Sequence, residues 1–102
     1  MISEHKQTRK FDHGRILSTP AAIEIIKAAG HRPIEFLARH LSGDWGTICE
    51  EDRQLNADAL VDGSRLMSSY ITSGGEKIWI ITEAADQNGY RTATTILLPS
   101  EY

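Results

Sequence analysis

The sequence predicts a single α+β domain in which three helices pack on an antiparallel sheet of three or four strands, in the order β-α-α-α-β-β-β. Two observations predict this class. The 102 residues, 40% of them hydrophobic and 25% charged, have the size and composition of one soluble globular domain. The spacing of apolar residues is helical before Gly63 and has a period of two after it. Residues 1–12 are polar and are expected to be a flexible segment before a domain over residues 13–102.

A short strand and a helix are predicted at the start of the domain. The apolar run at residues 14–18 lies between a glycine and a proline and indicates a strand. Thr19 is the predicted N-cap of the helix that follows, Pro20 takes its first position, where a missing N–H costs nothing, and Gly30 ends it. The buried stripe of this helix is predicted to be Ala22, Ile23 and Ile26.

Pro33 begins a second, shorter helix. Its apolar residues at i, i+3, i+4 and i+7 predict a buried stripe of Ile34, Leu37, Ala38 and Leu41. Glu35 and Arg39 are expected to pair on the exposed side, with the acid nearer the N-terminus. His40 lies beside the stripe, and we expect it at the surface.

The third helix begins after a run of acidic residues. Residues 47–50, "TICE", match a capping box, in which the hydroxyl of Thr47 and the carboxylate of Glu50 satisfy each other's backbone N–H groups. Glu51 and Asp52 then place negative charge at the positive end of the helix dipole, so the acidic run needs no ligand to explain it. The helix is expected to continue through Leu55, Ala59 and Leu60 and to end at Gly63.

Three sequential antiparallel strands are predicted at about residues 65–72, 76–84 and 91–98. Two-residue loops at Gly74-Gly75 and Asn88-Gly89 place Tyr70 opposite Trp79 and Ile81 opposite Ile96. One face then carries Leu66, Tyr70, Trp79, Ile81, Glu83, Thr94, Ile96 and Leu98, and the other carries Met67, Ile71, Ile78, Ile80, Thr82, Thr95 and Leu97. Both faces are apolar and need a cover. The helices cover one. For the second, the amino-terminal segment of the chain, a protein partner, a second copy in a homodimer and a ligand all remain open.

Charge and cysteine content bear on the class of protein. The formal net charge of −3 does not favour nucleic acid as a partner, because phosphate contacts need clustered Lys and Arg. Cys49 is the one cysteine, so no internal disulfide forms, and with four scattered histidines no zinc spacing can be written. We expect no metal and no cofactor. Without a signal sequence or a long apolar run, the expected location is cytoplasmic, with no membrane partner.

Three segments carry a resemblance to a known family: "SGDWG" at residues 42–46, "KIWIITEA" at 77–84 and "TTILLPSEY" at 94–102. With them the chain resembles, over about residues 14–102, a family of short, mostly uncharacterised bacterial proteins of plasmids and integrative mobile elements. Members are labelled plasmid-related protein or type I restriction-modification subunit. The chain departs from that pattern in a longer final hairpin, "ADQNGYRTA". It lacks the Asn-Pro-Pro-aromatic motif and the glycine-rich turn that an adenine methyltransferase needs, so the resemblance implies association with mobile elements rather than methylation.

Five residues are candidates for a binding site, and no catalytic residue can be assigned. Asp44 and Trp45 lie between glycines in a link between helices, where the favoured interpretation is structural: Trp45 fills the core and Asp44 bonds backbone amides. Tyr70 and Trp79, if exposed, are suited to stacking on a peptide or on bases. Glu83 is the candidate for acid-base chemistry. Cys49 is expected to be a buried, inert thiol.

The predicted function is that of a non-enzymatic accessory or interaction protein of a mobile element. Its contact surface is either the sheet face with Tyr70, Trp79, Ile81 and Ile96 or the link at residues 42–46. The alternative is a small RNA-cleaving, toxin-like enzyme in which Glu83 acts with a basic neighbour, Arg65, Lys77 or Arg91. On the predicted register, Glu83 shares its face with Lys77 but not with Arg65.

Overall fold

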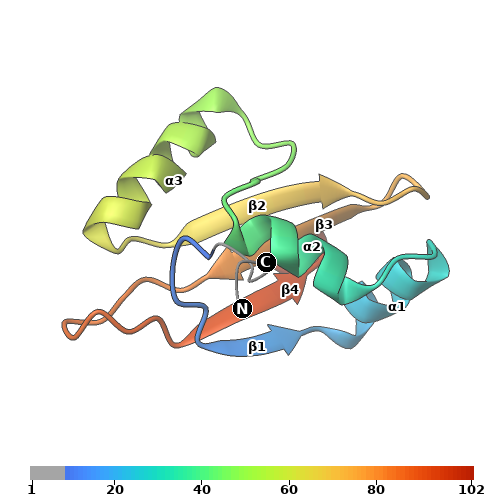
Figure 1. Cartoon of the computed structure of the whole chain (residues 1–102). Coiled ribbons are helices and arrows are strands. Elements are labelled where there is room, and N and C mark those ends of the chain that lie inside the picture. The colour runs from blue at the N-terminus through green and yellow to red at the C-terminus, as the bar shows by residue number, and fades with distance from the viewer. Residues whose placement is uncertain (1–8) are drawn as a thin grey trace, which may run out of the picture.

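A computed structural model describes residues 9–102, and its elements follow the predicted order (Figure 1). Strand β1 (Arg15–Ser18) precedes helices α1 (Pro20–Ala28), α2 (Pro33–Leu41) and α3 (Glu50–Asp62). Strands β2 (Leu66–Ile71), β3 (Lys77–Thr82) and β4 (Ala93–Leu97) follow, and then a 3₁₀ turn, η2 (Pro99–Glu101). The α+β class is confirmed, and the three later strands lie within their predicted ranges.

The strands form one sheet in the order β1-β4-β3-β2. β2, β3 and β4 are antiparallel neighbours, as predicted, but β1 runs parallel to β4, so the sheet is mixed rather than antiparallel. Figure 1 shows α1 and α2 lying across one face of the sheet and α3 beside β2. We call the face under α1 and α2 the inner face and the opposite face the outer face.

The two hairpin loops each contain three residues, one more than predicted. In the first, the Thr72 N–H donates to the Glu76 carbonyl at 2.8 Å, and Gly75 takes the left-handed conformation with φ +87°. In the second, the Asp86 N–H donates to the Tyr90 carbonyl at 2.8 Å, and Gly89 has φ +86°. A turn followed by a left-handed glycine is the usual form of a three-residue hairpin loop. The predicted two-residue loops are therefore wrong.

The extra residue in each loop moves the register by one position. Tyr70 lies opposite Ile78 rather than Trp79, and Ile80 rather than Ile81 lies opposite Ile96. Because side chains alternate along a strand, each β3 side chain points to the opposite face from the predicted one, relative to β2 and β4. The inner face carries Leu66, Ser68, Tyr70, Ile78, Ile80, Thr82, Thr94 and Ile96, and the outer face carries Met67, Ser69, Ile71, Lys77, Trp79, Ile81, Ala93, Thr95 and Leu97. The predicted contact face of Tyr70, Trp79, Ile81 and Ile96 is thus divided between the two sides.

The inner face forms the core with α1 and α2. Helix α1 starts as predicted, because the Thr19 hydroxyl accepts the Ala22 N–H at 3.2 Å. Of its predicted buried stripe, Ala22 and Ile26 are fully buried and Ile23 is only partly buried. Ala22 and Ile26 pack with inner-face residues of the sheet and with Phe36. A second cluster consists of Trp45, Ile48, Ala59 and Leu66, with Phe11 and Met67 packed against it. Phe11 thus contacts the domain from within the segment predicted to be flexible, of which residues 1–8 lie outside the described residues.

Helix α2 buries a different stripe from the predicted one. Phe36, Leu37, His40 and Leu41 are buried, whereas Ile34 is exposed. Phe36 has the largest apolar side chain of the helix, so turning it inward removes more apolar area from water than Ile34 offers. That rotation carries His40 into the interior, and the prediction of a surface histidine is wrong.

Helix α3 begins two residues later than a Thr47 cap requires, at Glu50 instead of residue 48. Cys49 occupies the N-cap without a side-chain bond and is exposed rather than buried. The Thr47 N–H and hydroxyl both donate to the Ser69 carbonyl of β2, at 2.7 and 3.1 Å, so Thr47 pairs with the strand instead of capping the helix. The helix continues through Leu55, Ala59 and Leu60 and ends at Gly63, as predicted. It packs through Asn56 and Ala59 and leaves Leu55 and Leu60 exposed.

Candidate functional site

The link between α2 and α3 holds Asp44 and Trp45 in contrasting environments. Gly43 and Gly46 have φ of +90° and +77°, so the link turns sharply at both sides of the pair, as predicted. Trp45 is buried and packs between Phe11 and His40, which confirms its assignment to the core. The Asp44 side chain remains half exposed.

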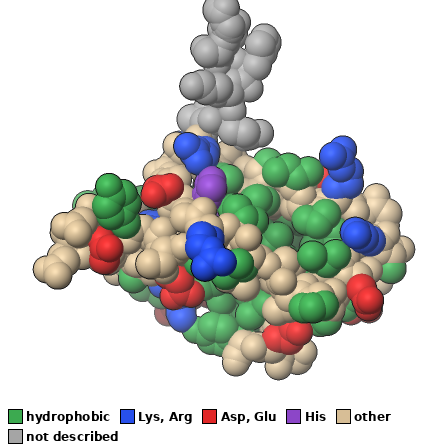
Figure 2. All heavy atoms as spheres, turned by 90° about the horizontal axis from the view of Figure 1, so that it is seen from below, with side chains coloured by type: hydrophobic (Ala, Val, Ile, Leu, Met, Phe, Trp, Pro, Cys, Tyr) green, Lys and Arg blue, Asp and Glu red, His purple; other side chains and the backbone are tan. Residues whose placement is uncertain are grey.

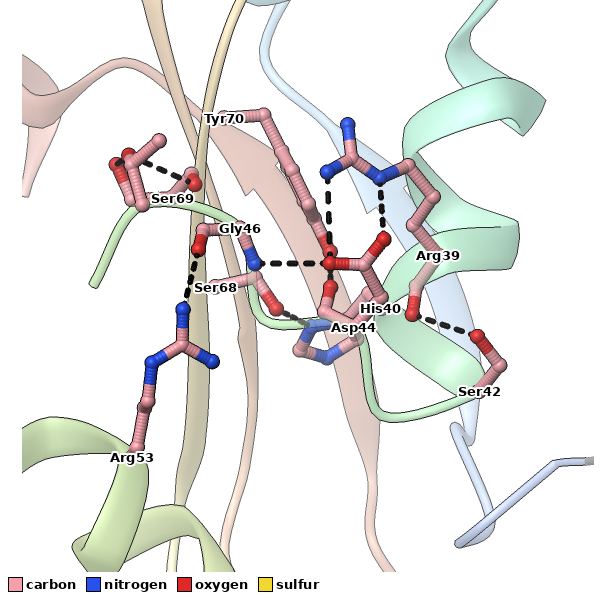
Figure 3. Close-up of polar contacts among 10 residues, drawn as sticks. Arg39, His40, Ser42, Asp44, Gly46, Arg53, Ser68, Ser69 and Tyr70 are labelled. Carbon is pink, nitrogen blue, oxygen red and sulfur yellow. Dashed lines mark hydrogen bonds and ion pairs between the residues drawn. The ribbon is translucent and has the colours of Figure 1, made fainter. Parts of the chain in front are cut away.

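The carboxylate of Asp44 is held by an arginine and a backbone amide (Figure 3). Arg39 Nε donates to Asp44 Oδ2 at 2.7 Å, and the Gly46 N–H donates to Oδ1 at 3.2 Å. The Tyr70 hydroxyl donates to the Asp44 carbonyl at 2.7 Å, and the Arg39 guanidinium lies over the Tyr70 ring at 4.6 Å. The expected pair of Glu35 with Arg39 is wrong, because Arg39 binds Asp44 and the Glu35 carboxylate lies 3.0 Å from a nitrogen of His31.

This cluster fixes a turn and does not resemble an acid-base site. The hydrogen bond from Arg39 lowers the pKa of Asp44, with the Gly46 amide adding to that effect against a smaller cost of desolvation. A carboxylate that is more acidic than usual and already paired is a weak proton acceptor near neutral pH. Tyr70 is also unsuited to proton transfer, since its burial raises its pKa well above the ordinary value. Asp44, Trp45 and Tyr70 are therefore brought together, in a structural role.

A polar row crosses the inner face directly beneath α2. His40, fully buried, joins the Ser68 hydroxyl through Nδ1 and the Thr82 hydroxyl through Nε2 at 2.9 Å. Thr82 and Thr94 join their hydroxyls at 2.7 Å, and the Thr94 hydroxyl donates to the His13 carbonyl at 2.8 Å. The row therefore links β2, β3 and β4 through side chains that have no contact with solvent.

The order of donors fixes the tautomer of His40. Thr94 donates its one hydroxyl proton to the His13 carbonyl, so in the bond between Thr82 and Thr94 the donor must be Thr82. Thr82 then accepts from His40, which places the ring proton on Nε2 and leaves Nδ1 to accept from Ser68. Burial lowers the pKa of His40 to about 3, in agreement with a neutral ring. His40 is a fully satisfied internal residue and lies out of reach of a ligand.

The other two candidates, Trp79 and Glu83, lie on the opposite side of the sheet from Tyr70. Trp79 is partly exposed, and its ring meets that of Tyr102 edge to face at 5.7 Å. The Arg65 guanidinium lies 5.2 Å from the centre of the Tyr102 ring and donates to its hydroxyl. We call Trp79, Tyr102 and Arg65 the outer-face stack. Tyr102 contacts both the middle of β3 and the start of β2, so the chain itself covers the centre of this face, and Ile81 and Leu97 are buried there.

Glu83 has no partner suited to acid-base chemistry among the described residues. Lys77 shares its face, but six residues of strand separate the two by about 20 Å, too far to flank one phosphate. The Arg91 guanidinium donates to the carbonyls of Ser64, Glu83 and Ala59, and is thus engaged by backbone. Continuing the observed register places Arg65 opposite Glu83, on the same face, contrary to prediction. An arginine remains protonated, however, and so cannot exchange protons with Glu83.

A hollow of about 420 Å³ lies between the end of α3 and the β3-β4 hairpin. Its wall includes Asp12, Asp62, Asp86 and Arg91. It is open to solvent, and no cluster of three His, Cys, Asp or Glu side chains placed to hold a metal is found among residues 9–102. None of the helices described is long and apolar enough to cross a membrane.

Comparison with protein families, with curated proteins and with solved structures finds no match to the chain. The resemblance to proteins of plasmids and mobile elements therefore stays a prediction. Sequence reasoning missed the roles of Arg39, Arg65 and Tyr102. Arg39 and Asp44 are five residues apart across a helix end, a spacing without a standard pairing rule, and the contacts of Arg65 and Tyr102 join residues 37 apart in sequence.

Proposed function

We propose that the protein is a non-enzymatic accessory protein of a mobile element and that it binds another protein by adding a strand to β1. The assignment to a mobile element rests on the sequence resemblance. The observation that carries the binding mode is the difference between the two edges of the sheet: one is closed by the chain itself, and the other is open.

The β2 edge is closed. The side-chain amide of Asn56 donates to the Met67 carbonyl at 2.8 Å and accepts the Met67 N–H at 3.2 Å, as a neighbouring strand would. One step along, the Ser69 N–H donates to the Trp45 carbonyl at 3.1 Å, and the Ser69 carbonyl accepts the Thr47 N–H at 2.7 Å. Such covering prevents an edge from pairing with other chains.

The β1 edge is open. The N–H groups of Arg15 and Thr19 donate to the carbonyls of Thr92 and Ile96 at 3.0 Å, so in a parallel pair the N–H and C=O of Ile16 point away from the sheet. Among the described residues, β1 pairs with β4 alone. Ile16 and Leu17 are 42% and 40% exposed. Figure 2, seen from the β1 side of the molecule, shows hydrophobic side chains spread between charged ones across this surface.

These features suit an extended segment of a partner protein. Strand addition supplies backbone bonds to Ile16, and the side chains of Ile16 and Leu17, on opposite faces, select apolar residues at two neighbouring positions of the partner, one on each face. β1 is only four residues long, so backbone bonds alone are few and the apolar contacts must contribute to affinity.

The proposal is tested by selecting extended peptides from a random library on the wild-type protein. We expect bound peptides to slow exchange of the Ile16 amide hydrogen and Ile16→Pro to abolish binding, because proline removes an N–H that no β4 residue uses. Leu17→Ala, which keeps every backbone group, is the control and should only weaken binding. Peptides that bind Ile16→Pro equally well, or wild-type dimers that this variant dissociates, would refute a partner strand on β1.

The rival function, an RNA-cleaving enzyme, has less support, because Glu83 lacks a proton-transfer partner within reach. Incubation of mixed RNA with wild type and Glu83→Gln tests it. RNA cleavage that the substitution removes would reverse the order of the two proposals.

A further inference from the structure

Independently of β1, we propose that the outer face binds single-stranded nucleic acid. Trp79 and Tyr102 stack on bases, and Arg15, Arg65 and Lys77 contact the phosphates.

The fold places a group of acidic residues away from the outer face and several basic residues on it. The net charge of the chain is −3, but five of its acids lie on α3, beside the β2 edge. On the outer face the register places three cations, because Arg15 is paired with Ala93, Lys77 belongs to β3, and Arg65 contacts Tyr102. Glu83 is the one acid that the same register adds to this face. Glu101, in the 3₁₀ turn before Tyr102, is a second acid on this face, and its carboxylate accepts from the Thr19 hydroxyl and the Leu98 N–H. The three cations still outnumber the two acids, so this face attracts a polyanion even though the whole molecule is acidic.

The aromatic residues sit among these cations. Tyr102 is 63% exposed, and Trp79 is partly exposed beneath it. Arg65 already stacks on the Tyr102 ring, so one planar cation is held next to the ring on which a base would lie. Aromatic and arginine planes on a sheet face bind unpaired bases in this manner with little preference for sequence.

The shape of the face favours a single strand over a duplex or a protein. A duplex exposes its base edges only in grooves, and the outer face presents strands and one 3₁₀ turn rather than a helix that could enter a groove. Protein interfaces are depleted in lysine, whereas Lys77 lies exposed on the same strand and the same face as Trp79. None of the three cations forms an ion pair with a described residue, so each remains available to a phosphate.

The test measures fluorescence anisotropy of labelled single-stranded oligonucleotides of about 12 nucleotides, oligo-dT and oligo-U, at several salt concentrations. We expect micromolar binding with a slope of log K against log salt of about −2, from three phosphate contacts on a single strand. Tyr102→Ala should weaken binding about tenfold. Lys77→Ala should weaken it and reduce the salt slope by about 0.7. Lys27→Ala, an exposed cation on α1, is the matched control and should change neither.

Tryptophan emission gives a second readout, because Trp79 is partly exposed and Trp45 is buried. Quenching by the oligonucleotide should persist at unchanged thermal stability in Lys27→Ala and disappear in Trp79→Phe. Four results would overturn the proposal: no binding at about 50 mM salt, equal losses in Lys77→Ala and Lys27→Ala, duplex DNA that binds as well as the single strand, or self-association of the wild type that Tyr102→Ala removes. Tighter binding of oligo-U would identify the ligand as RNA, and tighter binding of oligo-dT would identify it as single-stranded DNA.

Discussion

Acid should destabilise the protein through His40 well above the pH at which its carboxylates protonate. The buried ring has a pKa of about 3 in the folded protein, against 6.5 as the ordinary value. Between these values the unfolded chain binds a proton that the folded one does not, so stability falls as the pH drops below about 6.5. At pH 4.5, two pH units below the ordinary pKa, the free energy of unfolding should be about 2.7 kcal/mol lower than at neutral pH, since each unit contributes about 1.4 kcal/mol.

The assay is urea unfolding followed by tryptophan fluorescence at a series of pH values, for wild type and His40→Gln. Glutamine offers one donor and one acceptor to the hydroxyls of Thr82 and Ser68, but it does not titrate. The depressed pKa values of Asp44 and Asp62 act at lower pH, since the stability they confer is lost only as the pH falls below their ordinary value of 3.8. Parallel stability curves for the two proteins between pH 7 and 4.5 would refute a neutral, buried His40. So would an imidazole that titrates above pH 5 by NMR.

Two further substitutions address the β2 edge. Gly46→Ala should cost about 3 kcal/mol or more in urea unfolding, because a Cβ there would lie 2.0 Å from the Ser69 carbonyl oxygen at a positive φ. Gly75→Ala, with a similar φ but nothing within 4 Å, should cost about 1 kcal/mol, and equal losses would contradict the contact at Gly46. Asn56→Leu should cost about 3 kcal/mol by leaving both backbone groups of Met67 unpaired, and should expose an edge that self-associates in sedimentation. A monomer of unchanged stability would show that Asn56 does not protect the edge.

Local chemistry was sufficient to predict most element bounds. Thr19 and Pro20 start α1 and Gly63 ends α3 because caps and left-handed glycines act within a few residues of themselves. The hairpin loops show the limit of such reasoning. Gly74-Gly75 and Asn88-Gly89 signal a turn, but the choice between two and three loop residues depends on how Thr72 and Asp86 bond across it, and one residue reverses a whole face.

The sequence by itself determined the α+β class, the order of the elements and the glycines that turn the link around Asp44 and Trp45, because propensity and periodicity are local properties of the chain. Only the tertiary structure decided that His40 is inside, that Thr47 pairs with β2 instead of capping α3, and that Arg65 and Tyr102 meet over the outer face. In each of these cases, groups distant in sequence compete for the same hydrogen bond or the same buried area, and the outcome depends on packing that no local pattern records.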